Sequence, residues 1–199
     1  MGPIAEKKPR KKAVPAFLIY EEMDGKPIYR KGYKEVLAKK KTLEEIMGSS
    51  VLQALIISEV AIFLRQHLPK QYAVVVGEAG LHLNKGNNLA TDIAIYARKD
   101  ILNTLSENYF NVPAKLVIEV DIRAEIEHMV TQNDYVYQKT TKLLSFGIPK
   151  VIWITTPSRK LMVAEPGKDW IVADWHREVE LMEGLRLSLE QLLKDEGVL

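Results

Sequence analysis

The sequence predicts a mixed α/β fold in which helices cover both faces of one sheet. Two observations predict it. Residues 50–156 alternate between helical and extended patterns in the order α-β-β-β-α-β, and the extended segments are rich in β-branched residues and bounded by glycine, proline or asparagine. A β-hairpin is predicted before this core, and a second hairpin with a short helix is predicted after it.

The N-terminal hairpin is predicted at Asp24-Gly25, a dipeptide that favours the positive φ angles of a tight turn. The first long helix is predicted over about residues 50–68. Ser50 and Gln53 have the spacing of a capping box. In this motif the side chain of the first residue bonds to the backbone N–H of the fourth, and the side chain of the fourth reaches back to the backbone N–H of the first. Apolar residues occur nearly all round this helix, so we expect it to be packed in the core.

The predicted strands are short apolar segments that end at turn residues. They cover residues 72–76, 81–83, 89–97, 115–122, 150–156, 160–165 and 170–175. A second helix is predicted over about 129–146, where Gly147 occupies the position of a left-handed cap. The segment 98–112 is too irregular to assign, and the chain ends in a short amphipathic helix.

Composition restricts the function classes. The 199 residues are 47% hydrophobic, which suits one domain with a substantial core. The absence of cysteine excludes disulfides, thiolate zinc sites and a cysteine nucleophile. Five of the 28 basic residues lie between residues 7 and 12, so the small net charge of +2 belongs to the N-terminal segment. We expect residues 1–15 to be a disordered basic tail and residues 16–199 to be a single domain.

The basic tail has two interpretations. It could add non-specific affinity for phosphate groups through counterion release, or it could be a solvated terminus without a role. The first residues do not resemble a signal peptide, and no apolar run approaches the ~20 residues of a membrane helix. We therefore expect a soluble cytoplasmic protein that does not bind a membrane.

Three carboxylates interrupt strands that are otherwise apolar. Glu119 and Asp121 are two residues apart in one predicted strand, so they should point to the same face. Asp92 lies at the start of another apolar strand. A buried carboxylate is unfavourable unless it is paired, protonated or bound to metal. If the two strands are neighbours, the three carboxylates converge on one patch that suits a hard cation such as Mg²⁺.

Each of these residues also has a structural interpretation. Asp92 could be an acid beside a turn, and Asp121 could lie at the fraying end of its strand. Glu119 has apolar neighbours along the chain, but an edge strand with one wet face would tolerate it. Lys139 and Lys142, on the second predicted helix, would ordinarily be solvated surface lysines.

The order of these motifs resembles the Uma family of restriction-endonuclease-like proteins, in the PD-(D/E)XK nuclease superfamily. The matching motifs are Thr91-Asp92-Ile93, Leu116-Val-Ile-Glu119-Val120, and the helix from Lys139 through Gly147-Ile148 into a strand that contains Trp153. The family also begins with a Glu/Asp-Gly hairpin and a long helix, so the resemblance covers roughly residues 17–195. It implies a restriction-endonuclease-like αβββαβ core with an N-terminal hairpin and a C-terminal β-hairpin plus helix.

The resemblance implies that Asp92 and Glu119 are catalytic and bind the metal, with the Val120 carbonyl as a further ligand. It also implies that Lys139 replaces the lysine usually found two residues after the glutamate. The chain departs from the motif at that point, because Asp121 occupies the position. Glu78 is an accessory candidate, either as a further ligand or water-orienting group or as a simple turn residue. Asp121 is a second accessory candidate.

The activity implied is that of a magnesium-dependent or manganese-dependent endonuclease, which hydrolyses phosphodiester bonds in nucleic acid. DNA is the first expectation and RNA the alternative, and dimers are common in this fold. Two other classes remain open: a catalytically silent nucleic-acid-binding module, and an interaction scaffold in which Glu119 pairs with Lys139. The four histidines lie outside any nucleophile motif, and there is no glycine-rich phosphate loop.

Overall fold

The computed structural model describes residues 14–101, 106–125 and 132–199. Its α-helices and 3-10 helices are η1 (Ala16–Leu18), α1 (Tyr33–Leu37), α2 (Glu44–Met47), α3 (Val51–His67), η2 (Arg98–Asp100), α4 (Gln132–Ser145) and α5 (Leu189–Asp195). Its strands are β1 (Ile19–Met23), β2 (Lys26–Arg30), β3 (Tyr72–Asn84), β4 (Asn87–Ala97), β5 (Leu116–Val120), β6 (Ala124–Glu125), β7 (Val151–Thr155), β8 (Lys160–Ala164), β9 (Ile171–Asp174), β10 (Val179–Met182) and β11 (Leu185–Leu187).

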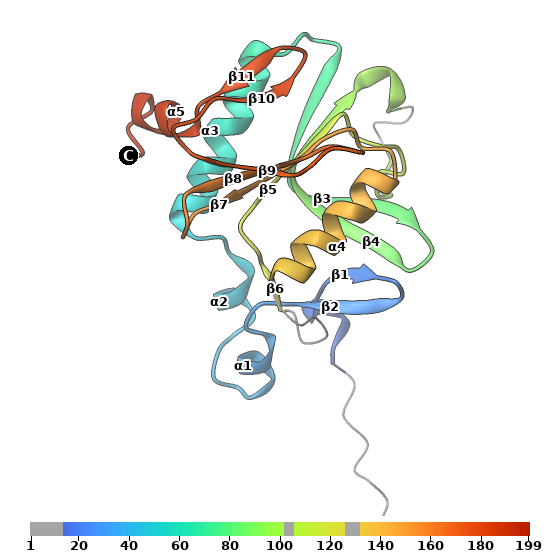
Figure 1. Cartoon of the computed structure of the whole chain (residues 1–199). Coiled ribbons are helices and arrows are strands. Elements are labelled where there is room, and N and C mark those ends of the chain that lie inside the picture. The colour runs from blue at the N-terminus through green and yellow to red at the C-terminus, as the bar shows by residue number, and fades with distance from the viewer. Residues whose placement is uncertain (1–13, 102–105, 126–131) are drawn as a thin grey trace, which may run out of the picture.

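One nine-stranded mixed sheet organises these elements (Figure 1). The order is β6-β2-β1-β4-β5-β7-β8-β9, with β3 along the other edge of β4. β5 and β7 are parallel, with α4 between them in the chain, whereas the remaining pairs in the sheet are antiparallel. The predicted α-β-β-β-α-β order is confirmed as α3, β3, β4, β5, α4 and β7, with the two predicted segments 72–76 and 81–83 together forming β3.

Two apolar cores lie on the two faces of the sheet. On one face, α3, α5 and the β10–β11 hairpin cover side chains such as Ile93, Ile118 and Ile152. On the other face, α4 covers Ala94, Val117 and other side chains. Because neighbouring residues in a strand point to opposite faces, each buried strand contributes alternately to the two cores. The predicted arrangement, with helices on both faces, is confirmed.

The N-terminal hairpin and the caps of the long helices form as predicted. Asp24 and Gly25 both have positive φ, 51° and 69°, and turn β1 into β2. The Ser50 hydroxyl accepts a hydrogen bond from the Gln53 N–H at 3.2 Å and caps α3. Gly147 has a φ of 105° and ends α4. Residues 129–131, the expected start of this second helix, and most of the expected basic tail lie outside the described residues.

Two predictions about elements are corrected. Residues 72–76 and 81–83 belong to one strand, β3, which is interrupted by a bulge where the register shifts between Val76 and Ala79. Only one face of α3 is packed, because Val51 and Ile62 remain 79% and 47% exposed. Apolar composition alone therefore overstated the burial of this helix. No helix in the described ranges is long and apolar enough to cross a membrane.

Candidate active site

Asp92 and Glu119 lie on the same face of the sheet. Asp92 is in the middle of β4 rather than at its start, and it alternates in phase with Ala94, a residue of the core beneath α4. Glu119 is in β5, in phase with Val117 of the same core. β4 and β5 are paired through Ile93 and Ile118. The alternation of side chains along each strand, which predicted that these carboxylates converge, therefore places both of them under α4.

Lys139 reaches this face from α4 and is almost completely buried. Its Nζ lies 2.7 Å from Glu21 Oε1, 3.0 Å from Glu119 Oε2 and 2.7 Å from the Ala90 carbonyl oxygen. The side chain is 1% exposed. An ammonium group has three N–H donors, so these acceptors use all of them. The interpretation of Lys139 as a solvated surface lysine is therefore wrong.

Glu21 is a member of this cluster that sequence reasoning missed. Its Oε1 accepts from the Ala90 N–H at 2.9 Å as well as from Lys139, and its Oε2 accepts from the Tyr135 hydroxyl at 2.6 Å. The sequence signal for Glu21 was weaker than that for Glu119. Its strand reads Ile-Tyr-Glu-Glu-Met, and the adjacent Glu22 is also charged, so Glu21 does not stand out as a lone charge inside an apolar strand.

The cluster fills a gap in the sheet. β1 pairs with β4 at Asn88, and β5 pairs with the same edge of β4 at residues 93–95. β3 occupies the opposite edge throughout. The N–H and C=O groups of Ala90 lie in the interval between β1 and β5, and the side chains of Glu21 and Lys139 take the place of a strand partner there.

Glu119 has one oxygen without a partner. Oε2 contacts Lys139, whereas Oε1 is buried and has no hydrogen-bond partner among the described residues. β5 lies between β4 and β7, so the interpretation of Glu119 as a residue of an edge strand is wrong. Burial raises the pKa of Glu119 well above its ordinary value, and the nearby Asp92 and Glu21 raise it further, although Lys139 opposes them.

Asp92 is tied to β5 through the backbone. Its Oδ2 accepts from the Val120 N–H at 2.8 Å. Burial raises the pKa of Asp92, and the Val120 hydrogen bond lowers it by a smaller amount. For Lys139, burial acts to lower the pKa, but Glu119 and Glu21 together hold it well above its ordinary value. The cluster thus combines a cation that stays charged with carboxylates that are unfavourable when ionised.

These shifts predict how stability depends on pH in the presence of a chelator. Between the ordinary and the raised pKa of Glu119, the folded protein binds more protons than the unfolded chain, so stability should rise as pH falls through this interval. The stability from Lys139 is fully present below its unfolded pKa of about 10.4, so it does not change in this window. Urea denaturation at several pH values measures the effect. Glu119→Gln should flatten the dependence, and equal slopes in both proteins would contradict this cause.

Val120 is positioned from the other face of the sheet. Its carbonyl oxygen accepts a hydrogen bond from Gln53 Nε2 of α3, whose side chain is buried. The predicted capping box would have the Gln53 side chain reach back to the N-terminus of its own helix. In the structure this side chain instead binds the last residue of β5. The Val120 carbonyl can act as a metal ligand only through its second lone pair.

The two accessory candidates have other partners. β5 ends at Val120, and Asp121 has a φ of 59°, so the expectation that it shares a face with Glu119 does not hold. The carboxylate of Asp121 accepts from the Thr156 N–H and hydroxyl at 2.8 and 2.6 Å. Glu78 lies in the β3 bulge and contacts Arg123 at 2.5 Å and Arg30 at 3.4 Å. Across the described ranges, no three acidic, histidine or cysteine side chains are placed to hold one metal ion. The predicted convergence of three carboxylates is therefore wrong.

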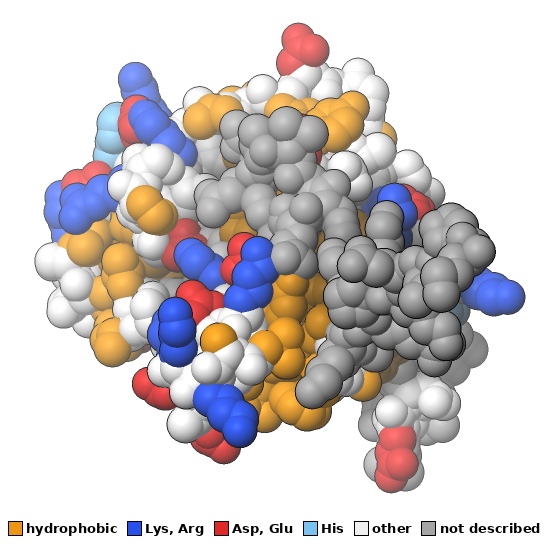
Figure 2. Space-filling view, turned by 90° about the horizontal axis from the view of Figure 1, so that it is seen from below, with side chains coloured by type: hydrophobic (Ala, Val, Ile, Leu, Met, Phe, Trp, Pro, Cys, Tyr) orange, Lys and Arg blue, Asp and Glu red, His pale blue; other side chains and the backbone are white. Residues whose placement is uncertain are grey.

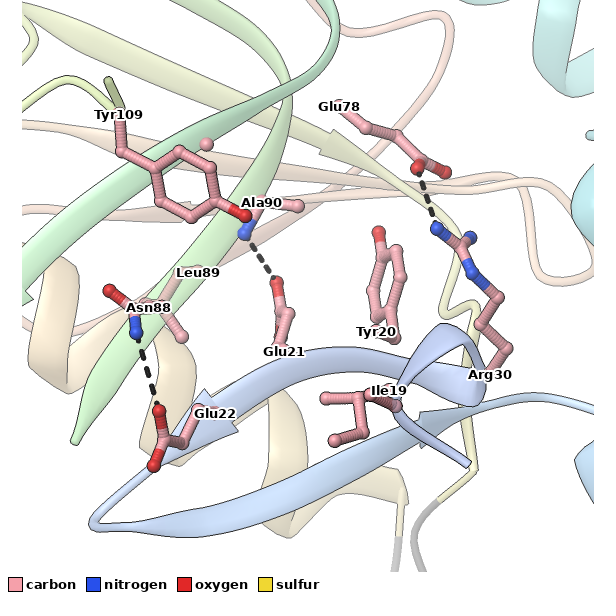
Figure 3. A pocket seen from close by; sticks show the side chains of 12 residues that line it. Ile19, Tyr20, Glu21, Glu22, Arg30, Glu78, Asn88, Leu89, Ala90 and Tyr109 are labelled. Carbon is pink, nitrogen blue, oxygen red and sulfur yellow. Dashed lines mark hydrogen bonds and ion pairs between the residues drawn. The ribbon is translucent and has the colours of Figure 1, made fainter. Parts of the chain in front are cut away.

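A pocket of about 390 Å³ adjoins the buried cluster. Glu21 and Ala90 line it together with Tyr20, Arg30 and Glu78, and Figure 3 shows Glu21 bound to Ala90 between Tyr109 on one side and the Glu78–Arg30 pair on the other. Asp92, Glu119 and Lys139 are 3%, 2% and 1% exposed and do not line this pocket. These three residues were expected to surround a concave surface patch. They form a buried cluster instead, and the pocket lies beside it.

The fold and this cluster define a mixed α/β protein with a carboxylate–lysine centre under α4. Among solved structures, the chain is similar to the "crystal structure of a putative nuclease belonging to DUF820 from Anabaena variabilis", with a TM-score of 0.61 and 16% identity. The match covers 87% of this chain and 89% of that one. At this identity the likeness shows a shared fold, which confirms the fold that the resemblance to the Uma family implied. No protein-family model and no curated protein matches the sequence.

Proposed function

We propose that this protein is a divalent-metal-dependent phosphodiesterase that hydrolyses nucleic acid. The observation that carries the proposal is the buried Oε1 of Glu119, which has no partner in the described part of the chain. An unpaired carboxylate oxygen in the interior is unfavourable. A cation beside Glu119 and Asp92 would give this oxygen a partner. It would also favour the ionised form of both carboxylates and so oppose the burial that raises their pKa values.

The donors present fit Mg²⁺ or Mn²⁺. Both ions prefer oxygen ligands, and Mg²⁺ is commonly bound by one or two carboxylates, with water and substrate phosphate completing its coordination. Glu119 Oε1 and the Asp92 carboxylate would hold the ion, and the second lone pair of the Val120 carbonyl would be the further ligand. A bound Mg²⁺ supplies an activated water and stabilises negative charge on the phosphate.

The main role of Lys139 in this proposal is to position the carboxylate of Glu119. It binds Glu119 Oε2 and Glu21 and so fixes the orientation that leaves Glu119 Oε1 free. Because all three of its N–H groups are used, direct contact with a phosphate requires that one partner be exchanged. The Tyr135 hydroxyl and the Ala90 backbone hold Glu21 in turn.

The cleavage assay uses labelled DNA and RNA, single-stranded and duplex, with Mg²⁺ or Mn²⁺ and with chelator. We expect cleavage only with metal, and a loss of at least about 100-fold in Asp92→Asn and Glu119→Gln, because even residues that only support metal ligands contribute 10–100-fold. Glu180→Gln is the control, since this exposed residue lies on the far β10–β11 hairpin. Equal cleavage by Glu119→Gln and the parent would contradict the proposal.

The second candidate function is a catalytically silent nucleic-acid-binding module. The observation that favours it is the saturation of Lys139 by Glu21, Glu119 and Ala90, together with the burial of the whole cluster. The same ion pairs would stabilise an interaction scaffold. Nucleic-acid binding that is equal with metal and with chelator, without cleavage under either condition, would identify the silent module.

A further inference from the structure

The pocket beside the cluster has two chemically different ends. Arg30 and Glu78 lie at one end, and Tyr109 lies at the other (Figure 3). Between them, Glu21 and Ala90 belong both to the pocket and to the buried cluster around Lys139. A ligand in this pocket would therefore lie beside Glu21, which Lys139 connects to the proposed metal ligand Glu119.

The charged end holds more donors than its acceptor can use. Glu78 pairs with both Arg30 and Arg123, whose side chains are only 20% and 19% exposed. Two guanidinium groups thus share one carboxylate. The Nε of Arg123 is buried and has no hydrogen-bond partner among the described residues. The Arg123 side chain does not line the pocket, whereas Arg30 does and shares the Glu78 carboxylate with it. Arg30 is therefore the guanidinium group open to a second anion, and phosphate matches this group in geometry.

The other end presents an aromatic face. Three adjacent ring carbons of Tyr109 lie 2.7–2.8 Å from the place where a Cβ at residue 80 would stand. Such similar distances mean that the face of the ring lies against Gly80, which only a residue without a side chain permits. Tyr109 is nevertheless 58% exposed. An exposed aromatic ring that is held flat against the backbone is a surface on which a nucleobase can stack.

We propose that this pocket binds one nucleotide of a single strand, with its base on Tyr109 and its phosphate on Arg30. This inference rests on the proposed function and specifies its substrate as single-stranded nucleic acid. A base reaches the face of Tyr109 only when it is unstacked from its own strand. Glu78 is the resident counter-charge that the phosphate displaces.

The wider surface agrees with a local binding site. On the face shown in Figure 2, acidic and basic side chains lie beside one another, with apolar area between them. A broad basic surface would bind any phosphate backbone, duplex included. The described side chains on this face form no such broad basic surface.

Binding is measured in chelator, so that the result does not depend on cleavage. The probe is a fluorescein-labelled oligothymidine of about twelve nucleotides, within the usual site sizes of single-strand binders, and anisotropy reports binding. We expect Tyr109→Ala to weaken binding by about 5- to 150-fold and Tyr109→Phe to retain it, because stacking needs the ring and not the hydroxyl. Tyr137→Ala is the matched control, since Tyr137 is a similarly exposed tyrosine at 60% on α4.

The charged end is tested in the same assay. Arg30→Gln should weaken binding and reduce the salt dependence of log K by about one unit, whereas Arg186→Gln, at an exposed pair with Glu178, should do neither. Glu78→Gln should strengthen binding, because it removes the competing negative charge but keeps an acceptor. Melting temperatures show that each variant is folded.

Three results would overturn the inference: no binding by the parent, equal binding by Tyr109→Ala, or duplex binding that is as tight as single-strand binding. Its failure is distinguishable from that of the proposed function. Binding with this pattern but without cleavage leaves the inference standing and removes the enzyme, whereas metal-dependent cleavage that is unaffected by Tyr109→Ala does the reverse.

Discussion

Replacing Lys139 by methionine is expected to destabilise the protein by about 3–5 kcal/mol, the range measured when one partner of a buried ion pair is removed. The variant would leave Glu21 and Glu119 without their common cation in a region where these side chains are 0% and 3% exposed. It would also remove the donor to the Ala90 carbonyl in the gap between β1 and β5. Urea denaturation, analysed with the two-state model, measures the loss.

Lys142→Met is the matched control. Lys142 lies one turn along α4 and pairs with Asp24 at 2.5 Å, but Asp24 is 63% exposed. Exposed ion pairs contribute about 0–1 kcal/mol, so this variant should be nearly as stable as the parent. Similar losses in the two variants would show that the buried network around Lys139 has no special role in stability.

Glu119→Gln should have the opposite effect on stability in chelator. The cluster holds the carboxylates of Glu21, Asp92 and Glu119 near one ammonium group, and burial and repulsion raise the pKa of Glu119. Neutralising Glu119 leaves Lys139 paired with Glu21. We therefore expect the variant to be as stable as the parent or more stable.

In the presence of metal, the parent should instead be more stable than Glu119→Gln. A cation that binds only the folded parent stabilises it by about 2.7 kcal/mol at one hundred times its dissociation constant. Glu119→Gln should lose this response, because the amide oxygen is a poorer ligand and carries no charge. Thermal and urea unfolding with Mn²⁺ and with chelator measure both effects. A destabilised variant in chelator, together with a parent that does not respond to metal, would support the scaffold.

The convergence of Asp92 and Glu119 was predictable because it depends on a simple periodicity. Both residues interrupt apolar strands, and the period of two assigns each to one face of the sheet. That β4 and β5 are neighbours could only be assumed. The position of Asp121 could not be read in the same way, because β5 ends one residue earlier and a φ of 59° turns the chain away.

Other parts of the site depend on contacts between distant segments. Glu21 is 118 residues from Lys139 in the chain, and Gln53 reaches Val120 across 67 residues. A local capping pattern explained Gln53 without reference to Val120, so the pattern concealed its tertiary role. The β3 bulge at Gly77 and Glu78 had the appearance of a turn between two strands, because a bulge and a turn both favour glycine.

The most direct test is a crystal structure of the full chain soaked in Mn²⁺, with data collected at a wavelength where manganese scatters anomalously. We predict one anomalous peak within coordination distance of Glu119 Oε1 and the Asp92 carboxylate, and its loss in Glu119→Gln crystals soaked in the same way. A parent structure at saturating Mn²⁺ that has no peak beside Glu119 would contradict the assignment of this buried cluster as a metal centre.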